Sequence, residues 1–227
     1  PLPDWLSTIE RHFKTHSGLG AIGGRDLLQY LSQEERDAEL VTRVGLISPT
    51  GRMCGDHHRG TGGFRHVQIL KGCNCAFRGS LLRKVGLDQN LQGKGAQTHW
   101  ELALCLDVLA EGYTVAYDSN LLVKHHIAPR FDGDQNHRSG FSSEGIYDMA
   151  HNEAYVVRTR LRGLQRLGAE LRAGLVGSRM IPGFIQWLRL LVMRSPHATA
   201  RWNVARAGRA AALKTARHSS ITCSKTS

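Results

Sequence analysis

Hydrophobic residues recur every three or four positions in two stretches of the chain, and this spacing predicts amphipathic helices. The first helix should begin near Trp5 and extend to about His16. The clearest helical pattern covers 98–111, with apolar residues at i, i+3, i+4 and i+7, and Gly112 follows it as a stop signal. A shorter helix is expected over 79–85.

Short apolar runs bounded by turn residues predict strands between these helices. One short buried strand should open the glycine-rich segment 17–26 and end in a flexible turn, whereas the glycine-rich segment 54–64 predicts a loop. The other expected strands are 43–47, 67–70, 113–117 and 121–124.

The chain reads as helical from about Gly145 to its end. Its most apolar run, 181–193, is shorter than the roughly 20 residues that a membrane-spanning helix needs, and Arg189 interrupts it. Phe184 and Trp187 next to arginine suit a helix that lies in a membrane interface. The same run also fits a helix packed in a protein core, and the sequence leaves both interpretations open.

Charge is distributed unevenly along the chain. Residues 1–155 contain 16 lysines and arginines against 18 acidic residues, whereas residues 156–227 contain 14 against Glu170 alone. The net charge of +11 therefore comes from the last third. A basic segment of this kind attracts an anionic membrane surface, nucleic acid or an acidic partner.

Length and composition indicate a globular protein. At 227 residues, with 41% hydrophobic and 22% charged residues, the chain can hold one domain and a smaller appendage. The five cysteines are odd in number and do not predict a disulfide framework, which suits a reducing cytoplasm.

A series of short motifs runs through the middle of the chain. It starts with Lys-Gly-Cys-Asn-Cys-Ala-Phe-Arg at 71–78 and continues with Gly-Leu-Asp at 86–88. Thr-His-Trp-Glu-Leu-Ala-Leu at 98–104, Gly-Tyr at 112–113 and Val-Lys-His at 123–125 complete it. Their order and spacing resemble the second half of the catalytic domain of family 2 glycosyltransferases, which have the GT-A fold.

This resemblance implies an α/β protein with a partial GT-A fold. Residues 1–155 would be the C-terminal part of the catalytic domain, and residues 156–227 a basic helical tail that associates with a membrane surface. The enzymes it resembles transfer a sugar, with inversion, from a nucleotide-sugar donor to a saccharide or lipid-linked acceptor in cell-surface polysaccharide synthesis. The expected location is cytoplasmic, at the inner face of the cell membrane.

Two features of the resembled family are missing from this sequence. The donor-binding first half, with its acidic metal motif, has no counterpart here, so the chain alone is expected to be inactive or very weak. The Gln-x-x-Arg-Trp element of processive synthases is also missing, which favours the transfer of single sugars.

Glu101 occupies the position of the catalytic base in this resemblance, three residues before Leu104. The family usually has Asp there, preceded by Glu, whereas this chain has Glu preceded by Trp100. A carboxylate at this place would take the proton from the attacking acceptor hydroxyl. The alternative is local: Thr98 and Glu101 have the spacing of a capping box at a helix start.

Asn74 and Arg78 correspond to residues that line the acceptor site of the family. Asn74 could bind sugar hydroxyls or a diphosphate, because an amide both donates and accepts hydrogen bonds. Arg78 could pair with phosphate or with an acidic core residue. The alternative for Asn74 is a structural role in a tight turn.

The resemblance places the remaining candidates at the donor side. His125 would complete the coordination of a divalent Mg or Mn ion that bridges the donor diphosphate, and the alternative is an exposed or hydrogen-bonded structural histidine. Gly24, Arg25 and Asp26 match an element beneath the donor site, for which an ordinary turn is the alternative, and Arg130 could contact the diphosphate.

Two other functions compete with this reading. Cys73 and Cys75 could suggest zinc, but a tetrahedral zinc site needs a second ligand pair, and the sequence has no second cysteine pair. The basic tail could make the protein a nucleic-acid- or membrane-binding module without catalysis. Few aromatic residues for base stacking and no recognised binding motif in the tail argue against nucleic acid.

Overall fold

The computed structural model describes residues 1–29, 31–32, 35, 40–94, 97–126 and 141–223. The chain forms two compact units. Unit 1 comprises Pro1–Ser48, Met53–Leu87 and Glu101–Ala128, and unit 2 comprises Pro49–Arg52, Asp88–Trp100 and Pro129–Ser227. The boundary expected between residues 155 and 156 lies inside one continuous helix of unit 2, α5 (Ser143–Arg160).

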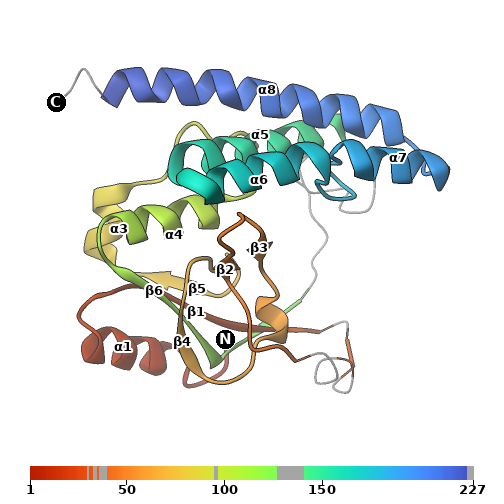
Figure 1. The fold of residues 1–227 in the computed structure, drawn as a ribbon. Coiled ribbons are helices and arrows are strands. Elements are labelled where there is room, and N and C mark those ends of the chain that lie inside the picture. Colours follow the sequence, from red (N-terminus) through yellow and green to blue (C-terminus); the bar gives the residue numbers. More distant parts are fainter. Residues whose placement is uncertain (30, 33–34, 36–39, 95–96, 127–140, 224–227) are drawn as a thin grey trace. The chain divides into compact units, whose positions relative to one another are not determined.

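Unit 1 is built around a four-stranded sheet with the strand order β4-β6-β1-β5 (Figure 1). The strands are β1 (Leu19–Leu28), β4 (Phe64–Val67), β5 (Cys75–Phe77) and β6 (Thr114–His125). The central pair, β1 and β6, is parallel, and the outer strands β4 and β5 are antiparallel to their neighbours. The expected α/β class is therefore confirmed, with a mixed sheet.

Helices cover both faces of this sheet, because successive strand residues point to opposite sides. On one face, Ile9 of α1 (Trp5–Thr15) packs with Ile22 and Ala116. On the other face, Leu81 of α3 (Gly79–Val85) and Cys105 of α4 (Trp100–Ala110) pack with strand residues next in sequence to Ile22 and Ala116. Those strand residues are Ala21, Val115 and Tyr117.

The helices of unit 1 agree with the sequence prediction, but the strands differ from it. The segment 17–26 does not turn at its glycines, because β1 continues to Leu28. The two strands expected over 113–124 form one strand, β6, whose pairing with β1 is interrupted between Gly24 and Arg25. Within the expected loop lie the short strand β3 (Met53–Cys54), paired with β2 (Leu46–Ile47), and the 3-10 turn η1 (His57–Arg59).

Unit 2 is helical, as predicted from Gly145 onward. Its helices are α5, α6 (Gly163–Leu175), α7 (Phe184–Val192) and α8 (Ala198–Cys223). The backbones of α5 and α8 approach closely at Gly208, where an added Cβ would lie 2.5 Å from the carbonyl oxygen of Tyr147. Buried alanines on both helices, including Ala150 and Ala205, complete this packing.

The run 181–193 has one packed and one exposed side. Ile181 and Leu190 are buried, whereas Phe184, Ile185, Leu188, Leu191 and Val192 of α7 are exposed. No helix in the described part of the chain is both long enough and apolar enough to cross a membrane.

Candidate functional site

Three potential metal ligands from distant parts of the sequence meet in unit 1. Asp26 comes from β1, Cys73 from the turn before β5 and His125 from the last position of β6, and their ligand atoms all lie within 4.8 Å of one another. They are the one such group of histidine, cysteine and acidic side chains found among the described residues. The parallel pairing of β1 with β6 aligns Leu28 with His125 and so brings the ends of both strands together.

The Asp26 carboxylate is the centre of this group. It is fully buried, and its Oδ2 accepts hydrogen bonds from Lys71 Nζ and from His125 Nδ1, the latter at 3.2 Å. Burial alone would raise the pKa of Asp26, but the hydrogen bonds and charges of Lys71 and His125 outweigh it and hold the pKa below its ordinary value. Asp26 therefore carries its negative charge at neutral pH.

The second carboxylate oxygen of Asp26 takes no part in these hydrogen bonds. This Oδ1 atom is buried and has no hydrogen-bond partner among the described residues. A buried carboxylate oxygen without a partner is costly, and a cation beside it would remove that cost. The group therefore has an anionic oxygen, an imidazole and a sulfur within reach of one ion.

Cys73 contributes a thiol rather than a thiolate. Although Cys73 is exposed, the removal of water around its sulfur and the Asp26 carboxylate raise the pKa of the thiol to about 11. A thiol is a weak ligand, and a bound cation would favour its deprotonation. Sequence reasoning missed Cys73 as a partner of His125, because it sought a second cysteine pair and not single ligands from other strands.

Asn74 is buried and holds three segments of unit 1 together. Its Oδ1 accepts a hydrogen bond from Trp5 Nε1 at 2.8 Å, and its Nδ2 donates to the carbonyl oxygens of Leu121 at 2.8 Å and Arg25 at 3.1 Å. These bonds tie α1 and β5 to the place where β1 and β6 separate. The side chain faces the interior and bonds to distant segments, not within its own turn.

Arg78 also bonds to the backbone. Its Nε donates to the carbonyl oxygen of Leu19 at 3.1 Å, one of its terminal nitrogens donates to Phe13, and its guanidinium lies over the Phe13 ring. Arg25 donates from Nε to the carbonyl oxygen of His58 at 3.1 Å. Both arginines therefore connect secondary structure elements, and Arg130 lies outside the described residues.

Glu101 lies in the first turn of α4. The capping-box alternative is wrong, because the helix begins at Trp100 after a left-handed His99 with φ 66°. Thr98 Oγ1 is buried without a hydrogen-bond partner among the described residues. The Glu101 carboxylate contributes to raising the thiol pKa of both Cys73 and Cys75.

His57 is a buried histidine to which the sequence assigned no role. Its Nε2 bonds to the carbonyl oxygen of Ile69 at 2.8 Å, and a carbonyl can only accept, so this nitrogen carries the proton. The hydroxyl of Tyr117 donates to the His57 carbonyl oxygen at 2.8 Å. Burial lowers the pKa of His57 below its ordinary value near 6.5.

This lowered pKa predicts a pH dependence of stability. The unfolded chain binds a proton at His57 below pH 6.5 and the folded chain does not, so unit 1 should lose stability as the pH falls below about 6.5. Urea unfolding at several pH values should show this slope, and His57→Gln should reduce it. If the stability of His57→Gln changed with pH as steeply as that of the unchanged chain, groups other than His57 would cause the pH dependence.

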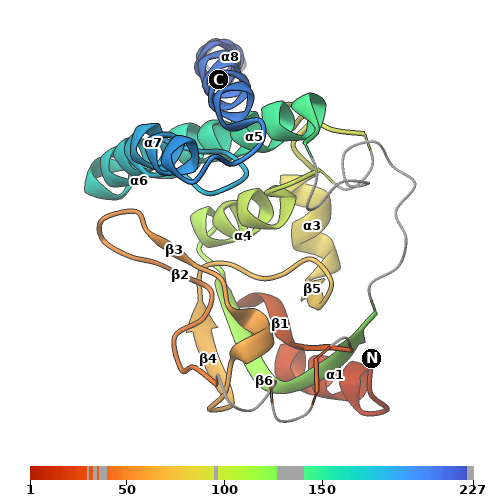
Figure 2. The ribbon, with the colours of Figure 1, turned by 90° about the vertical axis from the view of Figure 1, so that its right-hand side faces the viewer.

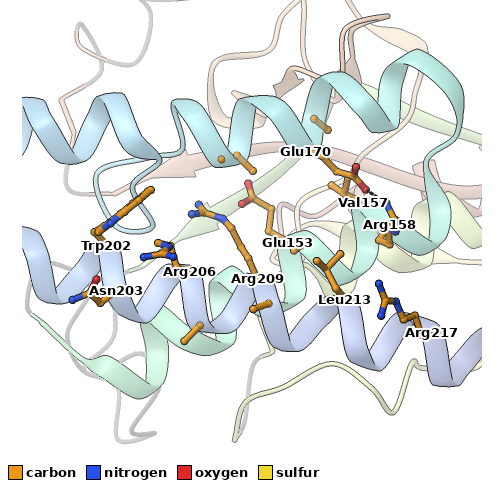
Figure 3. Close-up of a pocket in the computed structure, with 16 residues that line it drawn as sticks. Glu153, Val157, Arg158, Glu170, Trp202, Asn203, Arg206, Arg209, Leu213 and Arg217 are labelled. Carbon is orange, nitrogen blue, oxygen red and sulfur yellow. Dashed lines mark hydrogen bonds and ion pairs between the residues drawn. The ribbon is translucent and has the colours of Figure 1, made fainter.

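Unit 2 contains a cavity of about 720 Å³ between α5, α6 and α8 (Figure 3). Its floor is made of small apolar residues, and Arg158, Arg206 and Arg217 surround it. Inside it, Glu153 and Arg209 point toward each other, and their opposite charges attract. Arg209 also donates to the carbonyl oxygens of Ile181 and Pro182, which anchors the start of α7 to α8.

Asn152 is a second residue that the sequence did not reveal. It is fully buried on α5, where its side chain bonds to the backbone of Gln92 and Thr98 in the segment that leads to α4. No local signal marks a single polar residue inside a helix as such an anchor.

Comparison of the whole chain with protein-family models and with curated proteins finds no match.

Proposed function

We propose that unit 1 is part of a sugar transferase of the GT-A type, as the resemblance of its motifs implies. One observation supports this most. His125, expected at the donor diphosphate, meets the buried Asp26, expected beneath the donor site, in one cluster with Cys73. The mixed sheet that carries them agrees with an α/β transferase.

The ligand atoms of the cluster favour one of the two expected metal ions. Mg²⁺ prefers an octahedron of oxygen ligands, whereas Mn²⁺ also accepts imidazole. A carboxylate, an imidazole and a thiol therefore suit Mn²⁺ better than Mg²⁺, with Asp26 Oδ1 and His125 as the ligands and Cys73 beside them. When bound, the metal would neutralise the charge of the departing nucleoside diphosphate.

Other side chains of unit 1 have separate roles in the proposed reaction. Glu101 takes the proton from the acceptor hydroxyl while that oxygen forms a bond to the anomeric carbon and the bond from that carbon to the diphosphate oxygen breaks. Lys71 holds Asp26 in place and adds positive charge next to the diphosphate. Asn74 and Arg78 act as positioning residues, because their hydrogen bonds fix the loop before β5 and the ends of α1 and β1.

Manganese binding tests this proposal on the 227-residue chain. We expect Mn²⁺, followed by electron paramagnetic resonance, to bind more tightly in the presence of pyrophosphate, because the diphosphate would add oxygen ligands. His125→Ala should weaken Mn²⁺ binding at least about tenfold, since it removes one of few ligands. His125 lies at the end of its strand, so the loss should leave the fold intact.

His66→Ala is the matched control, because His66 is an exposed histidine of the same unit on β4. Its Mn²⁺ affinity should equal that of the unchanged chain. Manganese binding that is insensitive to both His125→Ala and pyrophosphate would contradict the proposed site.

A further inference from the structure

A stripe of leucines runs along the outside of α6. Its members are Leu164, Leu167, Leu171 and Leu175, and all four are exposed, Leu164 to 78%. At about 100° per residue these positions fall within an arc of roughly 80°. The buried residue of the helix, Ala169, lies roughly 150° from the centre of that arc. The leucines therefore point away from the interior of unit 2.

The next helix repeats this arrangement. In α7 the exposed apolar residues are Phe184, Ile185, Leu188, Leu191 and Val192, the last exposed to 85%. They cover an arc of roughly 120°, and the buried Leu190 lies roughly 160° from its centre. The two helices contact each other and lie together on one side of unit 2 (Figure 2).

We call the exposed apolar residues of these two neighbouring helices the α6–α7 surface. Apolar side chains rarely gather on a protein surface at this density unless something covers them. The buried residues Ala169 and Leu190 lie on the opposite sides of their helices from these exposed side chains. The surface is therefore available to a partner.

The charges around the α6–α7 surface indicate which partner fits. Residues 161–194 contain six arginines and one acidic residue, Glu170. Glu170 lies 2.9 Å from Arg158 and 4.0 Å from Arg166, so the remaining arginines leave the segment with an excess of positive charge. Arg172 and Arg189 flank the apolar arcs on their own helices, where the side chains of both are exposed.

We propose that the α6–α7 surface docks on an anionic lipid bilayer, with both helices parallel to the membrane plane. A helix with an apolar face bordered by arginines lies at the boundary between head groups and acyl chains. A second copy of this chain would bring arginines against arginines, and nucleic acid would leave the leucines uncovered. This docking does not depend on sugar transfer, because the surface lies entirely in unit 2.

Vesicle flotation tests the docking. The 227-residue chain should float with phosphatidylcholine vesicles that contain about one-third phosphatidylglycerol, and much less with phosphatidylcholine alone. The double variant Leu171→Glu, Val192→Glu should lower the partition coefficient at least about tenfold, because it places charges in the acyl region. Arg172→Gln combined with Arg189→Gln should lower it about tenfold on the anionic vesicles.

The matched control is the double variant Leu6→Glu, Leu87→Glu, which makes the same charge change at two exposed leucines of unit 1. Its partition should stay unchanged, and circular dichroism should show that all variants keep their helices. Three results would overturn the proposal: no binding to anionic vesicles, equal loss in the control, or a dimer in sedimentation velocity that Leu171→Glu, Val192→Glu dissociates. Tighter binding to duplex DNA than to anionic vesicles would also overturn it.

Discussion

Gly24→Ala should lower the free energy of unfolding of unit 1 by about 3 kcal/mol, because the new methyl group has no space. A Cβ at residue 24 would lie 2.0 Å from the carbonyl oxygen of Leu121 and 2.4 Å from its Cβ. Leu121 cannot move away, because its carbonyl oxygen accepts a hydrogen bond from Asn74 and its side chain is fully buried. Urea unfolding followed by circular dichroism measures the loss.

Gly18→Ala provides the control for this prediction. Gly18 directly precedes β1, and an added Cβ there would meet no atom within 4 Å. The alanine should therefore change stability by less than about 1 kcal/mol. If both variants had the same stability, the close approach of β1 and β6 at Gly24 would not be a constraint on the fold.

Asn152→Leu should be the most damaging single change in unit 2. The Asn152 side chain accepts from the backbone N–H of Gln92 at 2.7 Å and donates to the carbonyl oxygens of Gln92 at 2.8 Å and Thr98 at 3.0 Å. Leucine has nearly the same size but leaves these three backbone groups without partners. Each orphaned group costs about 1 kcal/mol or more, so we expect a loss of about 3 kcal/mol.

Hydrogen exchange gives this prediction a local readout. The amide of Gln92 should exchange much faster in Asn152→Leu, because its acceptor is removed. Asn203→Leu, at an exposed position of α8, should leave both the stability and the Gln92 exchange rate unchanged. Unchanged protection of Gln92 in Asn152→Leu would show that the segment 88–100 is held by other contacts.

The helices of unit 1 were predictable because their apolar residues repeat with the helical period. The strand β1 was not recognised at full length, since its glycines are a turn signal in the sequence. In the structure they are required by tight packing: an added Cβ at Gly20 would lie 2.6 Å from Val108, and one at Gly23 would lie 2.6 Å from the carbonyl oxygen of Asn74. Such crowding comes from segments distant in the sequence, so no local pattern reveals it.

The candidate site was predictable only in part. The resemblance placed Asp26 beneath the donor site and His125 at the metal but did not predict their contact, and the structure brings them to 3.2 Å. The sequence missed Lys71 and Cys73 as their neighbours, because the turn that carries both residues reaches the site through the pairing of β5 with β1. Asn74 was expected to face a ligand, but its amide is used by hydrogen bonds to Trp5 and two carbonyl oxygens.

The interruption between β1 and β6 has a consequence for how this part of the chain can change in length. Gly24 is opposite Asp118, but Arg25 is opposite Leu122, so β6 inserts three residues before pairing resumes. Side chains along a strand alternate between the two faces of the sheet. If a change of one residue in 119–121 shifted the register of 122–125 against β1, His125 would move to the opposite face and separate from Asp26. The register of β6 after this insertion therefore determines whether the ligand cluster exists.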